Sequence, residues 1–121
     1  PTAGLDPKGR SEILELISSL REKTGMTIVL VSHSMDDVAE YVNRIVVMDH
    51  GGKMFDDVPR EVFRHVEELE SMGLAAPQVT YMMHQLRKNG FDVDPDAITI
   101  EEAKEEILKA LAERRQNAWQ K

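Results

Sequence analysis

His33 is the residue whose type and position most favour a chemical role. It follows Met26–Val31, a run of apolar or β-branched residues that predicts a strand buried between two layers of an α/β protein. In open α/β sheets, functional side chains lie just past the carboxyl ends of the strands. The alternative is a loop histidine with a hydrogen-bonded ring, and position alone leaves both interpretations open.

The other polar residues form no familiar catalytic or metal-binding pattern. The four histidines (33, 50, 65 and 84) include no i, i+4 pair with a carboxylate in the metalloprotease arrangement. Ser32, His33 and Asp36 are too close in sequence for a hydrolase triad, and there is no nucleophile elbow. A glycine-rich phosphate loop with Lys and Ser or Thr is also missing from the sequence.

Composition narrows the class of protein. The 121 residues are 41% hydrophobic and 31% charged, which suits one globular domain or a core with a small appendage. A net charge of −7 argues against nucleic acid as a partner, because phosphate neutralisation needs a basic surface. There is no cysteine. Since the sequence starts at Pro1 within an expected loop, we expect it to be a piece of something longer, whose strands would flank residues 26–31.

The elements before residue 58 are typical of α/β proteins. Asp6 and Pro7 are a good N-cap and first residue for a helix that Gly25 would end, and this helix leads into the strand at 26–31. A short helix is expected from about Met35 to Tyr41. After it, Ile45–Met48 and Lys53–Asp56 read as two strands joined by a tight turn at Gly51 and Gly52.

The elements after residue 58 are predicted to be helical. One helix starts at Pro59 behind a poor cap, Val58, and presents one apolar face: Val62, Phe63, Val66 and Leu69. A second helix starts at Pro77 and ends at Asn89–Gly90, with four residues expected to point inward: Val79, Met82, Met83 and Leu86.

A third helix begins at a capping box formed by Thr99 and Glu102, and we expect its polar end from Glu113 onward to fray. We therefore divide the chain into an α/β part, residues 1–58, and a helical part, residues 59–121. The methionines of the helical part are interpreted as core packing rather than as a ligand pocket.

Three segments, in order and at fitting spacing, resemble motifs of the ATP-binding-cassette ATPases. Pro-Thr-Ala-Gly-Leu-Asp-Pro at residues 1–7 resembles the D-loop that follows the Walker B strand. Val31-Ser32-His33-Ser34 resembles the H-loop at the end of a strand. Asn43–Met48 followed by Gly51–Lys53 is similar to the hairpin that ends the cassette core.

The helical part narrows the resemblance to one branch, the ATPase subunits of energy-coupling-factor importers of cobalt, nickel or vitamins. The segments that show this resemblance are Pro59–Phe63, Gly73-Leu74, Pro77–Thr80, Leu86–Gly90 and Ile98–Ala103. Val58 departs from the small hydroxyl residue usual before that proline, which weakens one helix cap. The implied fold is α/β: the C-terminal part of a P-loop NTPase (RecA-like/ABC) parallel-sheet core, followed by a small, mainly helical C-terminal domain.

The resemblance also implies roles for individual residues. His33 matches the switch histidine, which contacts the γ-phosphate and helps to position the attacking water. Asp6 matches the D-loop aspartate, which organises the interface between two ATPase subunits and caps the following helix. Ala3, Gly4 and Leu5 would touch the opposite subunit.

For the parent protein, the resemblance implies ATP and Mg as cofactors and ATP hydrolysis that energises import. Its partners would be a second ATPase subunit, identical or paralogous, a transmembrane coupling subunit and a substrate-binding membrane subunit, at the cytoplasmic face of the membrane.

The phosphate loop, glutamine loop, signature motif and Walker B strand are upstream in that family. We therefore expect the 121 residues alone to bind no cofactor and to be inactive. Two alternatives stay open: a non-enzymatic oligomerisation or regulatory module in residues 59–121, and another class of cassette ATPase.

Overall fold

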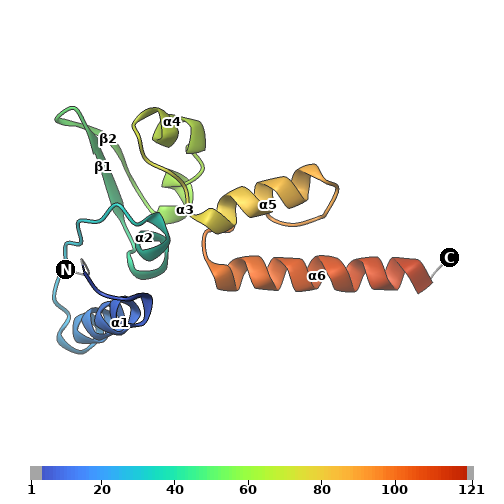
Figure 1. Ribbon diagram of the computed structural model, residues 1–121, viewed down its shortest axis with the longest axis horizontal. Coiled ribbons are helices and arrows are strands. Elements are labelled where there is room, and N and C mark those ends of the chain that lie inside the picture. The colour runs from blue at the N-terminus through green and yellow to red at the C-terminus, as the bar shows by residue number, and fades with distance from the viewer. Residues whose placement is uncertain (1–3, 120–121) are drawn as a thin grey trace. The chain divides into compact units, whose positions relative to one another are not determined.

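The computed structural model describes residues 4–119, which form six helices and one two-stranded sheet. The elements of the described residues are α1 (Pro7–Thr24), α2 (Met35–Tyr41), β1 (Ile45–Asp49), β2 (Gly52–Asp57), α3 (Pro59–Val62), α4 (Val66–Ser71), α5 (Gln78–Lys88) and α6 (Ile100–Trp119) (Figure 1). The chain divides into two units, Pro1–Val31 and Ser32–Lys121, and each is described by itself.

Helix α1 of the first unit begins and ends at the residues that its sequence predicts. The side chain of Asp6 accepts a hydrogen bond from the backbone N–H of Gly9 at 2.8 Å, and Pro7 is the first helical residue. Gly25 ends the helix in the left-handed conformation, with φ of 69°, and its N–H donates to the carbonyl of Arg21. Both ends are set by local chemistry, which explains why the sequence was sufficient to place them.

The prediction of a buried strand over residues 26–31 is wrong for this structure. The segment has no strand assignment, and Val29 and Val31 are each 85% exposed. A strand needs a neighbour to accept and donate its backbone hydrogen bonds, and the sheet of the described residues contains only β1 and β2. Those residues therefore form a mixed, mainly helical structure with one antiparallel hairpin in place of the expected parallel sheet.

The hairpin in the second unit confirms the two strands predicted after residue 44. β1 and β2 pair antiparallel, with Val47 opposite Phe55, and the turn uses positive φ at His50 (47°) and Gly51 (78°). Arg44 and Asp56 form a two-pronged ion pair, with Nε–Oδ1 and Nη2–Oδ2 distances of 2.7 and 2.8 Å. The Arg44 guanidinium lowers the pKa of Asp56 to about 2.

One core joins the hairpin to the helices on both sides of residue 58. Its buried members are Val38, Ala39, Val47, Val62, Phe63, Leu69, Ala76 and Ile98. The single helix expected from Pro59 is instead two short helices, α3 and α4, separated at residues 63–65. His65, in this break, stacks on Phe55 of β2 with ring centroids 4.6 Å apart and lies 3.0 Å from Glu68, so a tertiary contact accompanies the interruption.

Helices α5 and α6 run side by side and enclose a second, smaller core (Figure 1). Its buried members are Met83, Val93, Ala97, Ala103 and Ala110. Met83 is fully buried, whereas Met82 is 44% exposed, so the expectation that both point inward is wrong for Met82. The prediction that α6 frays from Glu113 is also not met, because the helix continues to Trp119.

Polar contacts tie the start of α6 to the rest of the second unit. Thr99 accepts from the N–H of Glu102 through its hydroxyl at 3.2 Å, while the Glu102 carboxylate accepts from the N–H of Ile98 at 2.9 Å, one residue earlier than in a standard capping box. The other Glu102 oxygen accepts from Arg60 of α3 at 2.7 Å. This carboxylate therefore satisfies both a backbone donor and a cation from a distant helix.

Candidate functional site

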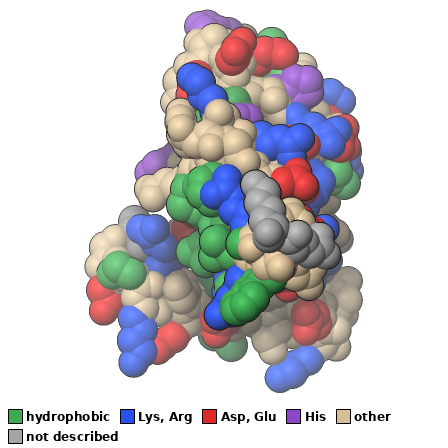
Figure 2. All heavy atoms as spheres, turned by 90° about the vertical axis from the view of Figure 1, so that its right-hand side faces the viewer, with side chains coloured by type: hydrophobic (Ala, Val, Ile, Leu, Met, Phe, Trp, Pro, Cys, Tyr) green, Lys and Arg blue, Asp and Glu red, His purple; other side chains and the backbone are tan. Residues whose placement is uncertain are grey.

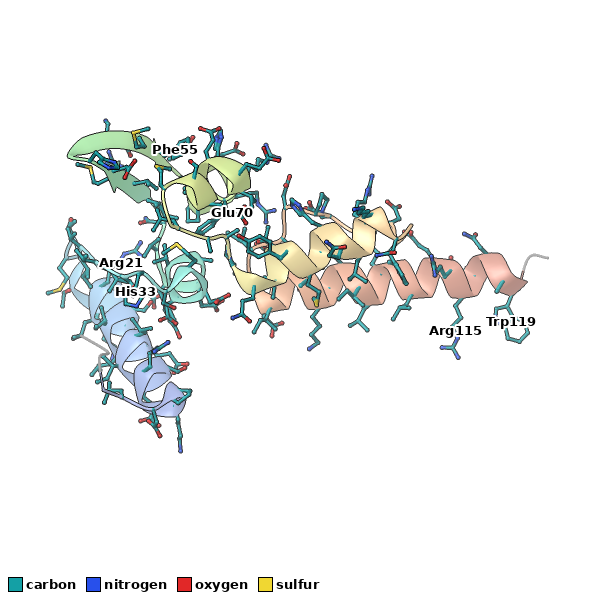
Figure 3. The ribbon with its side chains drawn as sticks, turned by 45° about the horizontal axis from the view of Figure 1, so that its top comes forward. Arg21, His33, Phe55, Glu70, Arg115 and Trp119 are labelled. Carbon is teal, nitrogen blue, oxygen red and sulfur yellow. The ribbon has the colours of Figure 1, made fainter. Side chains whose placement is uncertain are left out.

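His33 lies at the centre of a small turn directly before α2 (Figure 3). The hydroxyl of Ser32 accepts a hydrogen bond from the backbone N–H of Ser34 at 3.0 Å, so the chain folds around His33. Ser34 occupies the N-cap position of α2, but its side chain makes no capping hydrogen bond there. The turn is thus closed by the side chain of Ser32 and not by that of the N-cap residue, Ser34.

The imidazole of His33 is exposed, with no side-chain partner among residues 4–119. An imidazole whose nitrogens are not used inside the protein can donate a hydrogen bond to an external anionic oxygen. The structure therefore gives His33 the accessibility that a phosphate-contacting residue requires. The alternative that position alone left open, a loop histidine with a hydrogen-bonded ring, is met in its loop position, but the ring has no hydrogen-bond partner among residues 4–119.

Helix α2, which follows His33, is held by the first core and by a long-range hydrogen bond to α5. Val38 and Ala39 are buried in the first core. The carboxylate of Asp36 accepts from the backbone N–H of Gln78, the first residue of α5, at 3.1 Å. No local sequence pattern indicates this contact, because Gln78 is 42 positions away from Asp36.

The segment before α1 presents the other candidate residues within the first unit. Gly4 has φ of 80°, which non-glycine residues rarely adopt, and Leu5 is exposed. The Asp6 carboxylate is occupied by its cap on Gly9. Ala3, which was predicted to belong to the same turn, lies outside the described residues.

Two of the other histidines, His65 and His50, have side-chain contacts within the protein. His65 stacks on Phe55, and His50 lies 2.9 Å from Asp49 beside the hairpin turn. Among residues 4–119, no group of three or more His, Cys, Asp or Glu side chains is placed to hold a metal ion. The described residues therefore do not fit a magnesium site, and no step through a metal is assigned to them.

Comparison with known proteins shows which proteins share the sequence around these residues. The chain is 55% identical over 109 residues to the energy-coupling factor transporter ATP-binding protein EcfA2 of Clostridium tetani, covering 90% of this chain and 38% of that protein. It is 52% identical over 111 residues to EcfA2 of Acetivibrio thermocellus, covering 92% and 40%. It is 46% identical over 109 residues to EcfA1 of Caldanaerobacter subterraneus, covering 90% and 39%. The chain is homologous to part of these ATP-binding proteins.

The homology to energy-coupling factor ATP-binding proteins agrees with the resemblance found in the sequence motifs. No protein-family model matches the chain. The chain spans about 40% of the length of the curated relatives that it matches. The helices of residues 4–119 include none with the length and apolar character needed to cross a membrane.

Helix α6 of this ATP-binding-protein homologue has an exposed apolar face opposite the second core. Leu108 is 57%, Leu111 49% and Trp119 86% exposed. They border a shallow surface hollow together with Ala112, Arg115 and Gln116. Figure 2, which looks at the molecule from the side where α6 ends, shows hydrophobic and basic side chains at the surface there, and Figure 3 shows Arg115 and Trp119 extending from the same side of the helix.

Proposed function

We propose that this chain is part of an ATP-hydrolysing subunit that energises an energy-coupling-factor importer of cobalt, nickel or vitamins. The observation that carries the proposal is the exposed His33 in a chain that is homologous to energy-coupling factor ATP-binding proteins over nine-tenths of its length. In this proposal residues 1–58 belong to the nucleotide-hydrolysing core and residues 59–121 form an appended helical domain. The exposed segment 26–31 would become a strand by pairing with other strands of that core.

The proposed role of His33 is to bind the γ-phosphate and to orient the attacking water. Its imidazole N–H donates to an oxygen of the γ-phosphate, and its ring restrains the attacking water. Phosphoryl transfer depends mainly on positioning and on stabilising charge, so a fixed donor at the transferred group is an effective contribution. Bound Mg would supply charge neutralisation at the phosphates, held by other parts of the subunit.

Gly4, Leu5 and Asp6, with Ala3 before them, would face a second ATPase subunit across the nucleotide. The exposure of Leu5 and the positive φ of Gly4 support this, since both suit a turn that contacts another surface. The further partners would be a transmembrane coupling subunit and a substrate-binding membrane subunit. They would hold the ATPase at the cytoplasmic face of the membrane.

The test of the proposal uses the full-length subunit that contains this sequence, with His33→Ala and, as a matched control, His84→Ala. His84 is an exposed histidine of α5 whose side chain makes no hydrogen bond, ion pair or ring contact among the described residues. We expect His33→Ala to retain binding of a fluorescent ATP analogue and to slow phosphate release by about 10²-fold or more, the usual effect of removing a positioned catalytic group. His84→Ala should behave as wild type. Hydrolysis by His33→Ala at the wild-type rate would refute the proposal.

A second test concerns the chain alone. We propose that residues 1–121 by themselves bind no nucleotide tightly and are inactive, because the sequence contains no phosphate loop. Isothermal titration of the 121-residue chain with ATP and magnesium should show no heat of binding in the micromolar range. Micromolar binding would contradict this part of the proposal.

The exposed face of α6 favours a second candidate function, pairing between ATPase subunits. Glu105, Leu108, Ala112 and Arg115 are spaced by three or four residues and so share one side of the helix. If two such helices packed antiparallel about their midpoints, Glu105 of one would face Arg115 of the other. Reversing one charge, Arg115→Glu, should weaken self-association in sedimentation experiments, and adding Glu105→Arg should restore it. If the double variant associated no more strongly than Arg115→Glu alone, this face of α6 would be excluded as the pairing surface.

A further inference from the structure

A long-range hydrogen bond connects the helix that follows His33 to the helical part of the chain. The acceptor is the carboxylate of Asp36, the second residue of α2, and the donor is the backbone N–H of Gln78, 3.1 Å away. Gln78 is the first residue of α5, whose first N–H groups have no acceptor within their own helix. Asp36 therefore caps α5 from 42 positions earlier in the sequence.

Both ends of this contact are anchored. Val38 and Ala39 of α2 share the first core with Ala76, two residues before Gln78. The hydroxyl of Tyr81 accepts from the N–H of Ala76 at 3.2 Å and donates to Glu70 of α4 at 2.8 Å. The start of α5 is consequently held by α4 as well as by its own helix.

The anchored end of α2 is continuous with the His33 turn. The N–H of Val38 donates to the carbonyl of Ser34 at 3.1 Å, which is the first hydrogen bond of α2. Ser34 in turn donates its N–H to the hydroxyl of Ser32, closing the turn around His33. A displacement of the first turn of α2 must therefore move His33, because no flexible linker separates them.

We propose that Asp36 is a positioning residue for His33, and that the helical part of the chain sets the location of His33 through the Asp36–Gln78 hydrogen bond. This inference rests on the proposed function of His33. It gives the appended helices a role in hydrolysis without contact with nucleotide. It also predicts that the contribution of Asp36 comes from its acceptor oxygen rather than from its charge.

The experiment removes either the acceptor or the donor in the full-length subunit. Asp36→Ala deletes the acceptor, and Asp36→Asn keeps an acceptor oxygen without the charge. Gln78→Pro deletes the donor at the first helical position, where proline is tolerated, and Pro77 before it already has the extended backbone, ψ of 146°, that a following proline requires. Gln78→Ala is the matched control, since it alters the side chain and keeps the N–H.

Steady-state kinetics of ATP hydrolysis give the readout. We expect Asp36→Ala and Gln78→Pro each to lower kcat by about threefold to tenfold with KM within about twofold, the size of effect that loss of a helix-capping hydrogen bond can have on a populated geometry. Asp36→Asn should recover most of kcat, and Gln78→Ala should match wild type. The double variant Asp36→Ala, Gln78→Pro should be no slower than either single variant, because both remove the same bond.

Several outcomes overturn the inference. A kcat of Gln78→Pro equal to that of Gln78→Ala would show that the bond does not act on hydrolysis, as would additive losses in the double variant. If Gln78→Pro does not fold by circular dichroism, the comparison of Asp36→Ala with Asp36→Asn decides in its place, and equal rates refute the inference. His33→Ala separates this result from the proposed function: if it abolishes hydrolysis while Gln78→Pro has no effect, only the positioning role fails.

Discussion

Met83 and its neighbour Met82 offer a direct test of how α5 packs. Met83 is fully buried in the second core, whereas Met82 is 44% exposed on the same helix. Replacing Met83 by Ala deletes three side-chain heavy atoms and leaves a cavity, because the surrounding packed structure relaxes only partly. Met82→Ala is the matched control, since the chemical change and the helix are the same.

The two costs can be worked out from burial. Met→Ala in a well-packed core lowers the free energy of unfolding by about 2–5 kcal/mol, which combines the lost transfer free energy with the cavity. About half of the Met82 side chain is buried, so its truncation loses about 1 kcal/mol of transfer free energy and leaves no cavity. Alanine also has the better helix propensity by a few tenths of a kcal/mol. We therefore expect Met82→Ala to cost about 1 kcal/mol or less.

Urea denaturation followed by far-ultraviolet circular dichroism measures both variants. With a slope of about 1–3 kcal/mol per M, the midpoint of Met83→Ala should fall by about 1 M or more, while that of Met82→Ala stays close to wild type. Fluorescence of the one tryptophan is not suitable, because Trp119 is at the exposed end of α6. Equal midpoints for the two variants, or a larger loss for Met82→Ala, would refute the packing of α5 against α6.

Two further predictions concern charges at the ends of elements. Asp6→Ala removes the cap of α1 and should lower the stability of that helix by about 1 kcal/mol, seen as roughly fivefold faster amide hydrogen exchange in its first turns; unchanged exchange would contradict the cap. Arg44 lowers the pKa of Asp56 to about 2 in the folded state, against 3.8 as the reference, so the ion pair stabilises the fold above about pH 4 and this contribution is lost as the pH falls toward 2. Asp56→Asn should therefore flatten the acid side of the stability curve in thermal unfolding between pH 5 and 2, and an unchanged slope would argue against the pair.

Most element boundaries follow from residues that act on their immediate neighbours. Asp6 and Gly25 delimit α1 through hydrogen bonds within four residues, and Gly51 supplies the positive φ that closes the hairpin. The helices after Pro59 and Pro77 were also expected at these prolines. The homology found at 46–55% identity likewise agrees with motifs that are short and contiguous in sequence.

The errors of the sequence analysis arise where a residue's state depends on a distant partner. Residues 26–31 have the composition of a buried strand, yet a strand exists only where another strand accepts its backbone hydrogen bonds. The break between α3 and α4 coincides with the stacking of His65 on Phe55. Helical periodicity places Met82 and Met83 at the margin of one face and cannot decide which of them the neighbouring helix covers.

The sequence by itself therefore determined the caps, turns, helical periodicity and family motifs of this protein, including His33 as the leading candidate for chemistry. Only the tertiary structure decided that His33 is exposed in a turn closed by Ser32, and that Asp36 meets the N–H of Gln78. The physical reason is range: caps and turns are satisfied within a few residues, whereas a hydrogen bond across 42 residues exists only after the core has brought α2 and α5 together.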